Sequence, residues 1–232
     1  MNTRGLLDQL LKSGQDLLQN NKSSSQRQGG GTSQLGSLLS GAGGGALAAG
    51  ALGLLLGNKK ARKVGGKVLT YGGLAALGVL AYKAYGNWQS QQASAPRGEP
   101  QTVDRLPPAE MELHSQAILR AIVAAAKADG HIDDREREMI DGEIARFTAD
   151  ADLQAWLDRE LAKPLDPAEV ARAAQSEEMA AEMYLASLLM VDEENFMERA
   201  YLNELARQLS LDASLRSELE SEARKALQQV PA

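Results

Sequence analysis

Two short acidic segments hold the side chains of this sequence that are best suited to chemistry. One is residues 128–138, which contains Asp129, Asp133, Asp134 and Glu136; the other is residues 191–202, which contains Asp192, Glu193, Glu194, Asn195 and Glu198. Oxygen ligands of this kind, with no Cys or His among them, suit hard cations such as Ca²⁺ and Mg²⁺. Each segment lies between two stretches with helical apolar spacing. We therefore interpret them as a first and a second acidic corner between helices.

Helix capping explains the same residues without any ligand. Asp133 and Glu136 have the spacing of a capping box, and carboxylates are favoured at the positive end of a helix dipole. The first acidic corner does not fit an EF-hand loop. Counted from Asp129, its sixth position is Asp134 instead of Gly and its twelfth is Ile140 instead of Glu. The residues alone leave both capping and cation binding open.

The residue inventory excludes several kinds of site. The chain has no Cys, and its only two His are His114 and His131, so thiolate sites and a His-rich zinc site are excluded. Paired carboxylates can act as general acid and base. No nucleophile with a His partner and no phosphate-binding loop accompanies them here. We therefore expect no enzymatic activity and no cofactor beyond a divalent cation.

Charge and glycine divide the chain into two different halves. Residues 1–100 carry 11 Lys and Arg against 3 Asp and Glu, and they hold 20 of the 22 Gly; residues 101–232 carry 14 against 28. The net charge of −6 therefore describes neither half. The acidic half argues against nucleic acid, which requires a positive surface. We expect membrane lipid and envelope proteins as partners instead.

Residues 1–34 are expected to form an amphipathic helix and a flexible linker. Leu residues recur at helical spacing over residues 5–18, and such a helix could lie on a membrane surface or on protein. Residues 20–34 are rich in Asn, Ser, Gln and Gly, which is typical of a flexible linker.

Residues 35–88 are Gly-rich and apolar, and we expect them to insert into a membrane. Residues 35–57 contain no charge over 23 positions, which is enough for a span of about 20 residues. Residues 68–82 are shorter and would span only if extended to Tyr85 or Trp88. Interior Gly costs about 1 kcal/mol each in a soluble helix, whereas lipid enforces helix formation. A low-complexity segment or a soluble buried hairpin is the alternative.

A basic cluster between the two apolar stretches bears on orientation. It contains Lys59, Lys60, Arg62, Lys63 and Lys67. Such clusters stay on the cytoplasmic side of a membrane. The acidic half would be cytoplasmic if only residues 35–57 span. It would lie outside if residues 68–88 span, alone or in a hairpin with 35–57. After this region, residues 89–108 contain four Pro and read as an extended linker.

Residues 109–232 show helical period and helix punctuation throughout. Asp166 before Pro167, Ser176 and Asp212 have the positions of helix N-caps, and helices are expected over residues 177–190 and 196–209, among others. No stretch alternates polar and apolar residues as a strand would. The pattern predicts an all-α domain of about seven helices, and about 120 residues are enough to bury a core.

Two stretches look like the signature segments of the TerB-like (tellurite-resistance) helical domain. They are Ala-Asp-Gly-His-Ile-Asp-Asp-Arg-Glu over residues 128–136, and Glu-Arg-Ala-Tyr-Leu-Asn-Glu-Leu-Ala-Arg-Gln-Leu-Ser-Leu over residues 198–211. With the Gly-rich apolar half, the whole chain resembles the YebE-like inner-membrane proteins of Gram-negative bacteria, domain of unknown function 533. The resemblance implies an all-α fold of about seven helices and a place in the inner membrane.

The resemblance to TerB also implies divalent-metal binding. The ligands that it suggests are Asp129, Asp133, Glu136, Asp192 and Glu198. The second acidic corner departs from the pattern, because Asp192 is followed by Glu193 instead of Gly and its Asp-to-Glu spacing is six instead of seven. Our first expectation is a non-enzymatic, membrane-anchored envelope protein whose helical domain is an interaction or stress-related module. A divalent-cation-binding module is the second.

Overall fold

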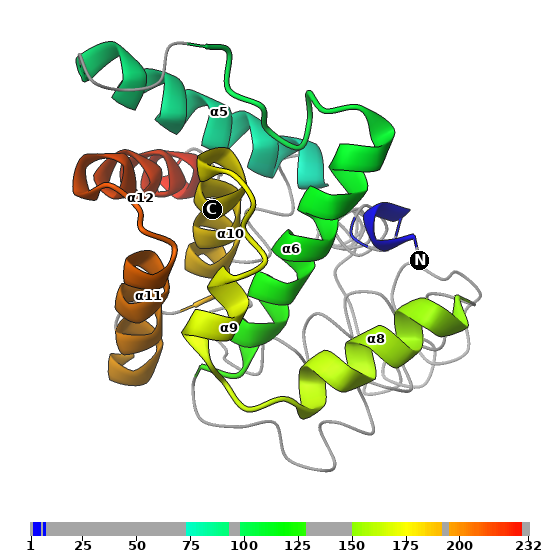
Figure 1. Cartoon of the computed structure of the whole chain (residues 1–232). Coiled ribbons are helices and arrows are strands. Elements are labelled where there is room, and N and C mark those ends of the chain that lie inside the picture. Colours follow the sequence, from blue (N-terminus) through cyan, green and yellow to red (C-terminus); the bar gives the residue numbers. More distant parts are fainter. Residues whose placement is uncertain are drawn as a thin grey trace, which may run out of the picture.

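The computed structural model of the chain describes residues 2–5, 7, 73–92, 98–128, 150–191 and 195–228. Every regular element in these residues is a helix, which confirms the predicted all-helical class for this part of the chain (Figure 1). The helices are α5 (Gly73–Gln91), α6 (Pro108–Ala126), α8 (Ala151–Ala162), α9 (Pro167–Ala171), α10 (Glu177–Met190), α11 (Phe196–Gln208) and α12 (Ala213–Gln228).

Local capping signals set the starts of three helices. The side chains of Asp166, Ser176 and Asp212 each accept hydrogen bonds from backbone N–H groups two or three residues further on, at 2.8 to 3.3 Å. These bonds satisfy N–H groups that have no partner within the first turn of a helix. The predicted starts of α9, α10 and α12 are confirmed, as is the predicted span of α10.

Helix α10 lies at the centre of the fold. It packs against α5, α6, α11 and α12 (Figure 1). Met183, Tyr184 and Leu185 are consecutive and fully buried, so no side of the helix in this region faces solvent. A helix that is apolar all round is expected in such a position. Each large side chain buried here stabilises the fold by about 1.5 to 3 kcal/mol.

Helix α5 packs against α10 and α12 along one face. Its buried residues recur every three or four positions: Leu74, Leu77, Ala81, Ala84, Tyr85 and Trp88. Lys83 and Asn87 lie on the exposed side. The described part of the expected membrane region therefore contacts protein along this face.

Hydrogen bonds from two aromatic side chains hold α5 in place. The Tyr85 hydroxyl donates to Glu177 Oε2 at 2.7 Å, and Trp88 Nε1 donates to Ser214 Oγ at 3.0 Å.

No helix among the described residues has the length and apolar character that a membrane crossing requires.

Residues 98–107, within the expected Pro-containing linker, pack on the helices without being helical. Val103 and Leu106 are buried, and the Arg105 guanidinium lies 3.9 Å from the centre of the Tyr82 ring. A cation over an aromatic face is attracted to its electrons. The segment is therefore fixed to α5.

The described N-terminal residues also contact the helical domain. Leu7 is buried in the core, and the backbone N–H groups of Thr3 and Arg4 donate to the Glu112 carboxylate at 2.7 and 3.2 Å. The remainder of the helix expected over residues 5–18, and the linker expected over residues 20–34, lie outside the described residues. Both flanks of residues 8–72 thus lie on one packed domain.

Candidate functional site

Helices α6 and α10 run parallel, so both acidic corners begin at the same end of this pair. His114 of α6 pairs with Glu182 of α10, and one to two turns later Ser187 Oγ donates to the Ala121 carbonyl at 3.4 Å. Residue numbers therefore increase in the same direction along both helices. The chain leaves this end through two buried residues, Ala128 and Val191.

Most of the predicted cation ligands fall outside the described residues. Asp129, Asp133, Glu136 and Asp192 are in this group. Glu198 is described, in the first turn of α11 with its side chain buried. In the described parts of the chain, no three His, Asp or Glu side chains are grouped so that they could hold a metal ion. Cation binding by the two corners stays a prediction.

One polar residue of the second acidic corner acts as a cap. Asn195 Oδ1 accepts a hydrogen bond from the Met197 N–H at 2.9 Å, and Asn195 is the N-cap of α11. The amide oxygen thereby satisfies a first-turn donor. The capping interpretation holds for this residue.

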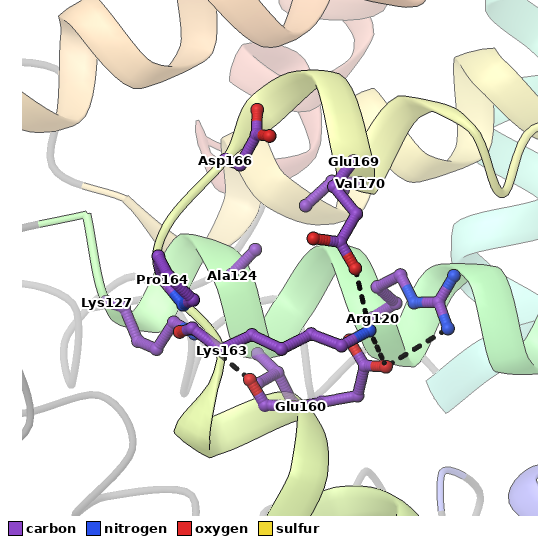
Figure 2. A pocket seen from close by; sticks show the side chains of 10 residues that line it. Arg120, Ala124, Lys127, Glu160, Lys163, Pro164, Asp166, Glu169 and Val170 are labelled. Carbon is purple, nitrogen blue, oxygen red and sulfur yellow. Dashed lines mark hydrogen bonds and ion pairs between the residues drawn. The ribbon is translucent and has the colours of Figure 1, made fainter.

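A charged cluster secures the end of α6 that leads into the first acidic corner (Figure 2). Lys127 Nζ donates to the backbone carbonyls of Glu160 and Lys163 at 3.0 and 2.7 Å, at the end of α8. The Glu160 carboxylate accepts from Arg120 at 3.1 Å and from Lys163 at 2.8 Å. Lysine is a favourable partner for the unpaired carbonyls at a helix end. The cluster therefore holds the C-terminal ends of α6 and α8 together.

The charged cluster is internally hydrogen-bonded and leaves little room for a ligand. Lys163 also pairs with Glu169 at 2.8 Å. The hydrogen bonds that Lys163 donates to Glu160 and Glu169 raise the pKa of Lys163, and the second of them lowers the pKa of Glu169. The cavity between these side chains has a volume of about 20 Å³. That is about the space of one water molecule. We interpret the cluster as a structural clamp.

A buried hydrogen-bonded pair lies nearer the other end of the same two helices. His114 Nδ1 and Glu182 Oε2 are 2.5 Å apart, and Glu182 Oε1 accepts from the Val103 N–H at 2.6 Å. Burial raises the pKa of the Glu182 carboxyl, against the opposing effect of these two hydrogen bonds. The pair connects α6, α10 and residues 98–107. Sequence reasoning missed it, although a Glu among the apolar residues of α10 was a usable signal.

A second cavity lies between α10, α11 and α12, and we call it the arginine groove. It has a volume of about 260 Å³ and is lined by Tyr184, Leu188, Arg199, Leu202, Asn203, Arg216 and Glu220. The Tyr184 hydroxyl donates to Glu220 Oε1 at 2.7 Å, and Arg216 Nε donates to the same oxygen at 2.8 Å. Sequence reasoning missed this site because its two arginines come from different helices.

In the residues that the structure describes, the fold is all-helical, two polar clusters brace the helices, and the arginine groove lies open beside them. The chain matches the family model described as "Protein of unknown function (DUF533)" over residues 41–223, and it belongs to this family. It is also similar to a Yersinia enterocolitica protein named "Uncharacterized protein in ampR 5'region", with 32% identity over 132 residues. That match covers 57% of this chain and 94% of the relative. No solved structure matches the chain significantly.

Proposed function

We propose that the chain is a non-enzymatic, membrane-attached envelope protein whose helical domain, TerB-like in its signature segments, is an interaction module. The observation that carries the proposal is that both flanks of residues 8–72 lie on the helical domain, through Leu7 and α5. Between these flanks lies the uncharged stretch 35–57, which is long enough to enter lipid.

This arrangement bears on how the chain attaches to the membrane. Residues 73–88 use their apolar face against α10 and α12, which favours residues 35–57 as the lipid-contacting part. A segment with both flanks on one domain has to enter and leave the membrane on the same side. The basic cluster, Lys59 to Lys67, follows the apolar stretch and precedes α5. Under the positive-inside rule it favours the cytoplasmic side of the inner membrane for the domain.

The proposal of a non-enzymatic role draws on the described imidazole. His114 is buried, and its Nδ1 is engaged by Glu182. A general acid or base has to reach the substrate proton within hydrogen-bond distance. His114 is therefore placed to hold helices α6 and α10 together. Among the described surfaces, the arginine groove is the one suited to binding a ligand.

Charge substitution in each apolar stretch tests the membrane attachment. Leu54→Arg with Leu55→Arg should release the full chain into the soluble fraction on carbonate extraction, because a charge in the bilayer centre costs about 2.5 to 3.5 kcal/mol. Val79→Arg is the matched control, since Val79 lies on the exposed side of α5. It should leave the chain in the membrane fraction. The proposal would be contradicted if Val79→Arg released the chain while the Leu54→Arg, Leu55→Arg variant stayed in the membrane fraction. That result would place lipid against α5.

We propose divalent-cation binding at the two acidic corners as a second function. The parallel α6 and α10 support it, because Ala128 and Val191 bring the start of both corners to one end of the pair. A cation at one hundred times its Kd would stabilise the domain by about 2.7 kcal/mol.

Thermal melts of the full chain with Ca²⁺, Mg²⁺ or a chelator test the second function. We expect a rise in melting temperature with cation that Asp129→Ala and Asp192→Ala abolish. Glu110→Ala, at the opposite end of α6, should retain the rise. An unchanged melting temperature at millimolar cation would remove this candidate.

A further inference from the structure

The arginine groove offers hydrogen-bond donors that the described residues do not use. Arg199 is exposed on α11, and its guanidinium makes no hydrogen bond or ion pair with any described residue. Asn203 Oδ1 accepts from Arg216 Nη2 at 2.7 Å, which leaves the Asn203 amide N–H groups for a ligand. Arg216 Nε is occupied by Tyr184 and Glu220, and its Nη1 group makes none of these bonds. The groove is therefore rich in donors.

One oxygen of the carboxylate that lines the groove is already engaged by groove residues. Glu220 is the carboxylate among the described lining residues, and its Oε1 accepts from both the Tyr184 hydroxyl and Arg216. Two guanidinium groups, those of Arg199 and Arg216, line the groove together with this single carboxylate. The groove is thus locally positive, although residues 101–232 carry 14 Lys and Arg against 28 Asp and Glu. A positive pocket with free planar donors selects an anionic oxygen group.

Apolar side chains line the groove beside these donors. Leu188 and Leu202 contribute to its lining and are otherwise buried in the core. Ligand pockets commonly combine an apolar lining with a few polar groups and have volumes of about 300 to 1,000 Å³. At about 260 Å³ the arginine groove accepts a small ligand or the end of a larger one.

We propose that the arginine groove binds a carboxylate carried on a short apolar chain. Arg199 and Arg216 hold the carboxylate, the Asn203 amide donates a further hydrogen bond, and the chain lies against Leu188 and Leu202. Inorganic phosphate would use the same donors but leave the leucines without a contact, so the lining favours the amphiphilic ligand. This inference names a ligand class for the interaction module and rests on that part of the proposed function.

Binding of small probes to the purified full chain tests the ligand class. Acetate, hexanoate, hexanamide and inorganic phosphate are titrated separately with ligand-observed NMR. We expect affinity to rise from acetate to hexanoate, by about fourfold for each methylene that the leucines bury. Hexanamide has the same apolar chain but no charge. It should bind at least about tenfold more weakly than hexanoate, because charge-assisted hydrogen bonds are lost and a tenfold change corresponds to about 1.4 kcal/mol. Equal binding of hexanoate and hexanamide, or binding of phosphate with no gain from acetate to hexanoate, would overturn the proposal.

Arginine variants locate the binding and separate this proposal from membrane attachment. Arg199→Gln should weaken hexanoate binding about tenfold or more without changing the melting temperature, because the Arg199 guanidinium has no described partner to lose. Arg216→Gln should weaken it as well and also lower the melting temperature, because Tyr184, Asn203 and Glu220 lose a donor. Arg224→Gln, exposed on α12 outside the groove, is the control and should bind as the natural chain does.

The decisive outcome is that of Arg199→Gln. Hexanoate binding at natural strength in this variant would refute the assignment of the carboxylate to the groove. The same variant should remain in the membrane fraction on carbonate extraction. A negative binding result therefore leaves the membrane attachment to be judged by its own test.

Discussion

His114 Nδ1 lies 2.5 Å from Glu182 Oε2 in the interface between α6 and α10. Both side chains are almost completely buried, and the second Glu182 oxygen accepts from the Val103 N–H. A buried pair of this kind is costly to desolvate and requires good geometry. Its position holds the register of the two helices from which both acidic corners emerge.

Removal of either partner of this pair should destabilise the domain. His114→Ala leaves the buried Glu182 carboxyl without its side-chain hydrogen-bond partner, and we expect the free energy of unfolding to fall by about 1 to 3 kcal/mol. Glu182→Gln should cost less, because its amide oxygen can still accept from the Val103 N–H. Urea unfolding measures both, with the exposed Glu110→Gln as control. A loss below about 1 kcal/mol for His114→Ala would show that the pair does not brace the helices.

Two glycines of α5, Gly78 and Gly86, should respond in opposite ways to substitution by alanine. A Cβ on Gly78 would overlap Asp104 Oδ1, which accepts from the Thr102 hydroxyl at 2.7 Å. We expect Gly78→Ala to destabilise by about 1 to 3 kcal/mol through overpacking. A Cβ on Gly86 meets nothing within 4 Å, so Gly86→Ala should stabilise by about 0.5 to 1 kcal/mol through helix propensity. Equal effects of the two changes in thermal unfolding would place α5 away from residues 98–107.

Stability should decline in alkaline solution because of buried tyrosines. Burial is the largest cause that raises the pKa of Tyr184 and of Tyr201 above the ordinary value of about 10. Because the folded state holds these protons more strongly than the unfolded chain, the stabilisation is complete below pH 10. It is lost as the pH rises above 10 towards the folded pKa. Melting temperature between pH 8 and 11 checks this, and Tyr201→Phe should flatten the decline. An equally steep decline in Tyr201→Phe would show that Tyr201 ionisation does not contribute.

Tyr201→Phe should also leave stability at neutral pH unchanged or slightly higher. The Tyr201 hydroxyl is buried and makes no hydrogen bond of good geometry with the described residues. Removal of an unsatisfied buried polar group avoids its desolvation penalty of about 1 to 3 kcal/mol. Urea unfolding at pH 7 measures the change. A loss of more than about 1 kcal/mol would indicate that the hydroxyl has a partner.

Local signals made much of the helical fold predictable. Asp166, Ser176 and Asp212 are followed by helices because their short side chains satisfy first-turn N–H groups, an effect confined to neighbouring residues. Local signals do not predict which element an apolar helix face will contact. The stripe from Leu74 to Trp88 has the same period against lipid or protein, so periodicity alone could not predict its contact with α10 and α12.

The candidate sites depended on long-range placement and were less predictable. His114 and Glu182 are 68 positions apart and meet because α6 and α10 run parallel. Arg199 and Arg216 come together in the groove only through the packing of α11 and α12 on α10. The acidic corners are recognisable in sequence because their residues are contiguous. Glu198 is the one suggested ligand that the structure describes, and its burial in α11 suits a helix-start residue as well as a ligand.

Compartment reporters at both ends of the full chain test the central claim most directly. Green fluorescent protein and alkaline phosphatase are fused in turn before Met1 and after Ala232. Because Leu7 and α5 lie on one domain, we predict both ends on the cytoplasmic side, with bright fluorescence and no phosphatase activity in all fusions. Ends in opposite compartments would mean a single crossing between them and would contradict this account.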